Sequence, residues 1–159
     1  MNLPTSTVIK ILWIDNTEIF NELQGFEKYN SSVYVWCDTQ QPFKFEFLSI
    51  KLNYMPIYIG KGITYGGVTN WRAVTHHNDA ITKIINANPG RYECYMVLMG
   101  IPDLFAACLE AKLIQTAVEK YQFRLTKMGT FPDTIYPRQL LNKKRERTKE
   151  IEANSILKF

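Results

Sequence analysis

The chain is poor in the features that mark several classes of protein. It has three cysteines in 159 residues, far apart and without a C-x-x-C pair, so neither a disulfide framework nor a zinc site is expected. No apolar run approaches the roughly 20 residues that a membrane-spanning helix needs. The apolar stretch from Ile11 to Ile14 is too short for a signal peptide, and Asp15 ends it. We therefore expect a soluble, cytoplasmic protein with no membrane partner.

Repeats, low-complexity segments and cofactor fingerprints are also absent. Gly60-Lys61-Gly62 invites comparison with a phosphate-binding loop, but the Gly-Lys-Ser/Thr pattern of such loops is missing. An α/β enzyme that acts on small phosphorylated molecules would therefore lack its expected binding loop. What the chain does have is a 46% hydrophobic content, enough for the core of one domain. Its net charge of +4 permits a polyanionic partner without requiring one.

Hydrophobic patterning predicts several short strands. The clearest are β-branched and aromatic runs, and the run at 55–59 is expected to end in a turn at Gly60-Lys61-Gly62. Alternation is weaker over residues 43–52, which we interpret as an inserted hairpin. The predicted strands cover residues 7–14, 32–37, 55–59 and 92–99.

Two longer helices are predicted around these strands. The first runs from Trp71 to Ala87 and ends before Pro89, and the second begins at Asp103 and ends near Tyr121. The order strand, strand, helix, strand, helix predicts an α/β (α+β) fold, with a small, mostly antiparallel three-stranded sheet flanked by helices. Two further helices are predicted, over residues 17–28 and, as a basic solvated helix, over 138–149.

Glu110 falls near the middle of the apolar arc of the second long helix. The residues one turn away are alanine, leucine and isoleucine. A carboxylate in such surroundings must be paired, protonated or bound to a metal, because an isolated buried charge costs several kcal/mol. Two interpretations of Glu110 remain: it forms a buried ion pair with an arginine, or it is a functional acid.

Arg72 and His76 are four residues apart in the first long helix, so their side chains share one polar face. His77 is rotated by about 100° and points toward the apolar side. Solvated surface charge is the alternative interpretation of this pair. A histidine-based metal cluster is not indicated, since neither a third histidine nor a cysteine is nearby.

These residues occur in an order that resembles the GIY-YIG endonuclease family. Ser32-Val33-Tyr34 is followed by Tyr58-Ile59-Gly60, then by Arg72-x-x-x-His76, Glu110 and Asn142. Serine and valine replace the usual glycine and isoleucine of the first motif. The two tyrosine motifs are also farther apart than in compact members, with residues 38–54 as an insertion. One such triplet is a weak signal, whereas four elements in the right order are much stronger.

The resemblance implies the GIY-YIG nuclease fold and a metal-dependent DNA endonuclease. Tyr34 and Tyr58 would act with Arg72 and His76 at the scissile phosphate, one tyrosine serving as general base. Glu110 would be the single protein ligand of Mg²⁺ (or Mn²⁺). Which tyrosine is the base stays open. The residues expected to contact DNA are Lys61, Asn142, Lys143, Lys144 and Arg145, although Asn142 would alternatively orient the site.

The resemblance also divides the chain into parts. Residues 32–143 form the predicted nuclease domain, 1–31 an N-terminal extension without a counterpart in the family, and 144–159 a basic tail. The tail is expected to bind the DNA backbone or, alternatively, to be ordinary solvated charge. The protein would act in the cytoplasm, of a host cell if encoded by a phage. A non-catalytic module that binds nucleic acid or protein on the same fold is the alternative function.

Overall fold

A five-stranded sheet forms the centre of the molecule. The computed structural model describes residues 9–11, 31–65, 69–70, 79–101, 103–126 and 135–143. The strand order in the sheet is β1-β5-β2-β3-β4. The central strands β5, β2 and β3 are antiparallel, as predicted. The bounds are β1 Ile9–Ile11, β2 Ser31–Phe47, β3 Ile50–Tyr65, β4 Thr69–Asn70 and β5 Tyr92–Ile101.

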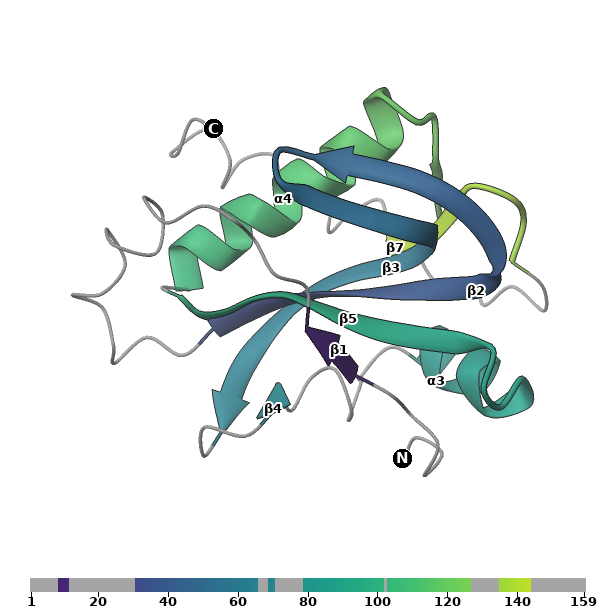
Figure 1. Ribbon diagram of the computed structural model, residues 1–159, viewed down its shortest axis with the longest axis horizontal. Helices are drawn as coiled ribbons and strands as arrows, with labels where there is room; N and C mark the ends of the chain where they lie inside the picture. Colours follow the sequence, from purple (N-terminus) through teal and green to yellow (C-terminus); the bar gives the residue numbers. More distant parts are fainter. Residues whose placement is uncertain are drawn as a thin grey trace.

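One helix lies on each face of this sheet (Figure 1). Helix α4 (Asp103–Glu119) runs along one face and α3 (Asp79–Ala87) packs near the end of the other. Side chains alternate between the faces along each strand. Val33, Val35 and Ile59 therefore join the core under α4. Tyr34 and Tyr58, which alternate with them, join the core under α3.

The helix predictions agree with the structure where residues are described. Helix α4 begins at Asp103 as expected, and α3 ends at Ala87, before Pro89. The first part of the predicted 71–87 helix lies outside the described residues, as does the predicted helix over 17–28. None of the helices in the described part of the chain is long and apolar enough to cross a membrane.

The predicted turn at Gly60-Lys61-Gly62 is wrong. Strand β3 continues through these residues to Tyr65, and each of them pairs with β2. Glycine commonly breaks a strand, but here its missing side chain makes room for a neighbouring ring, as described below.

The predicted solvated helix over 138–149 is also wrong at its start. Residues Gln139–Lys143 form strand β7, which runs parallel to β6 (Arg124–Thr126) in a separate two-stranded sheet. Leu140 and Leu141 are both buried. A fully solvated helix would expose these two leucines, so their burial outweighs the basic composition of the segment. The remainder of the predicted helix lies outside the described residues.

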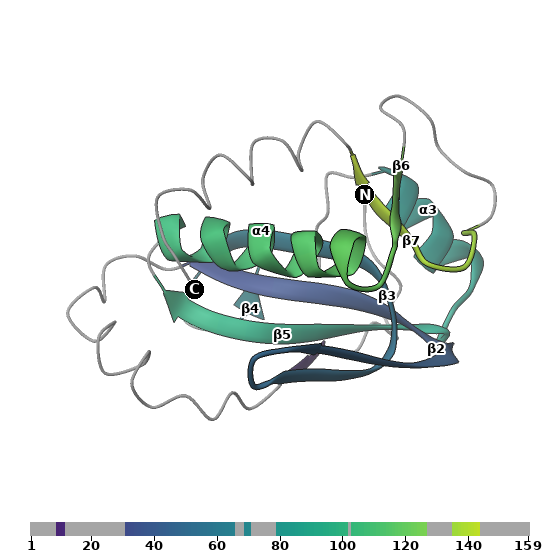
Figure 2. The ribbon, with the colours of Figure 1, turned by 90° about the horizontal axis from the view of Figure 1, so that it is seen from above.

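The predicted inserted hairpin is present, and it is longer than expected. Beyond Asp38, β2 and β3 continue as an arm formed by residues 39–54, which folds back and lies beside α4 (Figures 1 and 2). The pairing is irregular between Asp38 and Pro42, where the arm leaves the sheet. Phe45, Ile50 and Leu52 in the arm are buried in the core under α4. The insertion therefore enlarges the hydrophobic core.

The predicted N-terminal extension contributes to the same sheet. Strand β1 pairs in parallel with β5, with Ile9 opposite Cys94 and Ile11 opposite Met96. A parallel partner at this edge covers backbone groups of β5 that would otherwise face solvent.

Candidate active site

The two motif tyrosines lie together on the α3 face of the sheet. Tyr34 is the cross-strand partner of Gly60, and Trp36 is the partner of Tyr58, so the tyrosines are diagonal neighbours on one face. Their ring centroids are 6.3 Å apart with an interplanar angle of 29°. Tyr34 is 1% exposed and Tyr58 8%. Two motifs that are well separated in the chain are thereby joined in one pair.

Gly60 lies against both tyrosine rings. A Cβ atom at this position would be 2.6 Å from Cζ and Oη of Tyr34 and 2.7 Å from Cε1 of Tyr58. These distances are far below van der Waals contact, and a buried aromatic ring cannot move aside easily. Glycine is therefore required here by the close approach of the two rings.

Asn142 binds the backbone of the residue between Tyr58 and Gly60. Its Oδ1 accepts a hydrogen bond from the Ile59 amide at 3.0 Å, and its Nδ2 donates to the Ile59 carbonyl at 2.6 Å. The side chain is completely buried. Asn142 was expected to orient the site or to touch a phosphate, and both of its polar side-chain atoms bind the strand that carries Tyr58.

Lys61 is held at the start of α4, on the face opposite the tyrosines. Its Nζ donates to Oδ1 of Asp103 at 3.0 Å, and the Ser31 hydroxyl donates to the same oxygen at 3.0 Å. Burial acts to raise the pKa of Asp103, but the hydrogen bond and charge of Lys61, with Ser31, outweigh it and hold the pKa below its usual value. The ion pair with Asp103 partly neutralises the charge that Lys61 would offer to a phosphate.

Glu110 is buried in α4, as its place in the apolar arc predicted. It is 7% exposed, and its Oε2 atom is inaccessible to solvent. Leu109, Leu113 and Ile114 around it belong to the core under α4. Glu110 therefore comes from the helix on the face opposite the tyrosine pair.

Several predicted residues are not described by the structure. Arg72, His76, His77, Lys144 and Arg145 lie outside the described residues, and for Lys143 only the backbone in β7 is described. Within the described part of the chain, the predicted site is thus represented by the tyrosine pair, Asn142 bound beside it, and Glu110 and Lys61 on the side of α4.

Sequence reasoning missed the partners that hold this region together. Asp103 was identified only as the start of a helix, and Ser31 was not singled out. An acid at the first turn of a helix and a serine at the start of a strand are too common to reveal a cross-chain contact. Ile59 contributes through its backbone N–H and C=O, which bind Asn142. A pattern of side chains cannot reveal such a contact.

The described residues offer few ligands for a divalent metal. No group of three or more His, Cys, Asp or Glu side chains suited to a metal occurs in that part of the chain. Mg²⁺ keeps several water ligands and binds through one or two carboxylates and substrate phosphates, so Glu110 could serve it only through Oε1, because its Oε2 is inaccessible to solvent. Comparisons with protein-family models, with curated proteins and with solved structures found no match.

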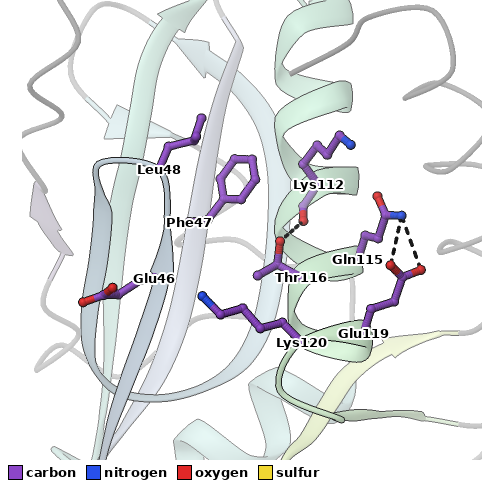
Figure 3. Close-up of a pocket in the computed structure, with 8 residues that line it drawn as sticks. All are labelled: Glu46, Phe47, Leu48, Lys112, Gln115, Thr116, Glu119 and Lys120. Atoms are coloured by element: carbon purple, nitrogen blue, oxygen red, sulfur yellow. Dashed lines mark hydrogen bonds between the residues drawn. The ribbon is translucent and has the colours of Figure 1, made fainter.

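An open groove between the tip of the arm and α4 is a separate feature (Figure 3). Its charged lining residues are two acids and two lysines, so their formal charges cancel and they offer little attraction to a phosphate backbone. None of the predicted site residues lines it. The lining residues are Glu46, Phe47, Leu48, Lys112, Gln115, Thr116, Glu119 and Lys120.

Proposed function

We propose that the protein is a metal-dependent DNA endonuclease of the GIY-YIG type, which hydrolyses phosphodiester bonds. The observation that carries the proposal is the close pairing of Tyr34 and Tyr58 beside Gly60. The motif resemblance predicts that these two tyrosines act together, and their rings pack against each other and against Gly60.

The chemistry assigns a distinct task to each residue. One tyrosine, ionised to its phenolate, accepts a proton from the attacking water and becomes a neutral hydroxyl. A free tyrosine has a pKa near 10, so nearby cations must favour its ionised form, and Arg72 and His76 would supply them. Arg72 would also hold the scissile phosphate through its fork of donors.

Glu110 is the residue proposed to hold the metal. When bound, Mg²⁺ or Mn²⁺ would neutralise charge on the phosphate and stabilise the leaving oxygen. The Glu110 carboxylate comes from α4, on the face of the sheet opposite the tyrosines. For Glu110 and the tyrosines to act at one phosphate, the metal would have to lie where both α4 and the strand that carries Tyr58 contact the substrate.

A non-catalytic module on the same fold is the second candidate. The placement of Glu110 among the buried side chains of α4 favours it, because a carboxylate used only for structure would also be buried there. Such a module would bind nucleic acid or protein without cutting DNA.

A plasmid assay tests the proposal. Supercoiled DNA is incubated with the protein in Mg²⁺ and in EDTA, and nicked and linear products are measured. We expect cleavage in Mg²⁺ only, and a loss of about 10²- to 10⁴-fold in the Tyr34→Phe or Tyr58→Phe variant whose hydroxyl is the base. Tyr136→Phe is the matched control, since Tyr136 is 65% exposed and belongs to neither tyrosine motif. Absence of cleavage by the wild-type protein in Mg²⁺, and in a parallel reaction with Mn²⁺, would exclude the nuclease.

A further inference from the structure

One side chain, that of Asn142, binds the outer edge of β3. The residue that it binds is Ile59, at the centre of the second tyrosine motif. The amide of Asn142 contacts both the N–H and the C=O of Ile59, 83 residues away in the chain. These two backbone groups point away from β2, and a further strand would normally pair with them. The amide carries one donor and one acceptor side by side, so it replaces the neighbouring strand at this position.

The residues before Asn142 pack on both sides of the same strand. Leu140 is completely buried in the core under α4, which also contains Ile59. Leu141 is buried in the core under α3, together with Tyr34 and Tyr58. Strand β7 therefore encloses the edge of β3, with one leucine on each face and the asparagine amide between them.

The geometry points to Asn142 as a positioning residue for the tyrosine pair. We infer that it fixes the β3 backbone at Ile59, and so the place of the Tyr58 hydroxyl relative to Tyr34, without touching DNA. Its complete burial and the use of both polar atoms within the protein argue against a phosphate contact. This inference rests on the proposed nuclease function for its effect on the reaction rate, while the effect on the tyrosines is independent of it.

Two variants separate positioning from general stabilisation. Asn142→Leu keeps the branched shape of the side chain but removes both hydrogen bonds to Ile59. Thr126→Val is the matched control. The buried Thr126 hydroxyl donates to the Leu140 carbonyl at 2.8 Å, so its removal weakens the attachment of β7 without affecting the amide of Asn142.

The first measurement is made by NMR on both variants. In Asn142→Leu we expect faster hydrogen exchange of the Ile59 amide and shifted ring resonances of Tyr34 and Tyr58, whereas Thr126→Val should retain the wild-type ring resonances. If Asn142→Leu does not fold, Asn142→Asp, which keeps an acceptor for the Ile59 amide, takes its place. Unchanged tyrosine resonances in the folded Asn142 variant would overturn the inference, whether or not the protein cuts DNA.

The second measurement is the cleavage rate at saturating DNA, compared with DNA affinity in the absence of metal. A misplaced tyrosine should lower the rate by about 10²-fold, as small displacements of reacting groups do, with affinity within about twofold of wild type. A lowered affinity and an unchanged rate would instead assign Asn142 to DNA contact and contradict positioning. A wild-type protein that does not cleave would refute the proposed function, and the NMR result would then decide the inference.

Discussion

At the scale of single residues, Gly60 is the position where sequence and structure are most tightly connected. The sequence motif singled out Gly60, but the prediction that this glycine forms a turn was wrong. Its actual requirement is space for two aromatic rings, because a Cβ atom would approach Tyr34 to 2.6 Å. Sequence patterns report that a glycine is present, whereas only packing shows what the missing side chain accommodates.

Replacing Gly60 by alanine tests this explanation. We expect Gly60→Ala to lower the free energy of unfolding by about 1–3 kcal/mol, the usual range for overpacking, and to alter the near-ultraviolet signal of the tyrosines. Gly90→Ala is the control: it has a φ of +79° and no atom within 4 Å of a Cβ. It should lose stability through backbone strain alone. The explanation is wrong if Gly60→Ala leaves the tyrosine signal unchanged.

Asp38 and Arg91 form a second residue-scale feature that the sequence did not indicate. The Arg91 guanidinium donates to both carboxylate oxygens, at 2.9 and 2.8 Å, and the Asp38 side chain is 1% exposed. The pair joins β2 to the start of β5 where the arm leaves the sheet. Burial acts to raise the pKa of Asp38, but the hydrogen bonds from Arg91, Gln41 and Gln40 outweigh it and lower the pKa.

This ion pair predicts a pH dependence of stability. Since the pKa of Asp38 is lower in the folded state, its stabilisation is present above about pH 4, the usual aspartate pKa, and is lost as the pH falls through the folded-state pKa. Arg91→Met should cost about 2–3 kcal/mol at pH 7. That is below the range for a fully buried pair, because Arg91 is 30% exposed. Urea unfolding at pH 7 and pH 3 should show the difference from wild type narrowing at acid pH. An equal difference at both values would contradict this assignment.

At the scale of elements, periodicity was informative where an element has one buried face. It predicted β5, the start of α4 and the burial of Glu110. It failed for β7, because Leu140 and Leu141 are adjacent and both buried, a pattern that fits neither an amphipathic strand nor a helix. The arm was predicted as a hairpin, but the sequence did not indicate that it returns beside α4 after the irregular pairing between Asp38 and Pro42.

The arm provides a prediction at this scale. It packs through Phe45, whose ring lies 5.0 Å from that of Tyr121, and the Tyr121 hydroxyl accepts a hydrogen bond from the Glu46 amide. Phe45→Ala should cost about 3–5 kcal/mol, as loss of a buried aromatic does. Leu48→Ala at the tip, where the leucine is 61% exposed, should change stability by less than about 0.5 kcal/mol. Chemical denaturation measures both variants. If both variants lose similarly little free energy of unfolding, the arm does not belong to the core.

At the scale of the whole molecule, the sequence predicts that the basic tail, residues 144–159, binds the DNA backbone. The tail follows directly on Lys143, the last residue of β7. Residues 144–149 contain Lys144, Arg145, Arg147 and Lys149. Removing 144–159 should weaken DNA binding and reduce the dependence of log K on log salt by about 0.9 for each phosphate that the tail neutralises. Binding measured at several salt concentrations tests this, and an unchanged slope would show that the tail does not bind the DNA backbone.

The order of the motifs along the chain predicted a central antiparallel sheet with both tyrosines on it, and the structure agrees. The sequence could not show that Glu110 and the tyrosines lie on opposite faces of the sheet. Alternation along a strand divides its residues between the two faces, but it does not say which helix covers which face. The assignment of Glu110 is therefore the central claim to be tested.

The most direct test compares wild-type protein with Glu110→Gln in single-turnover DNA cleavage over a range of Mg²⁺ concentrations. Glutamine keeps the size and hydrogen-bonding capacity of the side chain and removes its charge. We predict that the variant folds, binds DNA with nearly unchanged affinity, and shows no detectable cleavage at any Mg²⁺ concentration. DNA cleavage by Glu110→Gln at the wild-type rate would contradict the proposed metal ligand. Glu110 would then serve only the structure of α4.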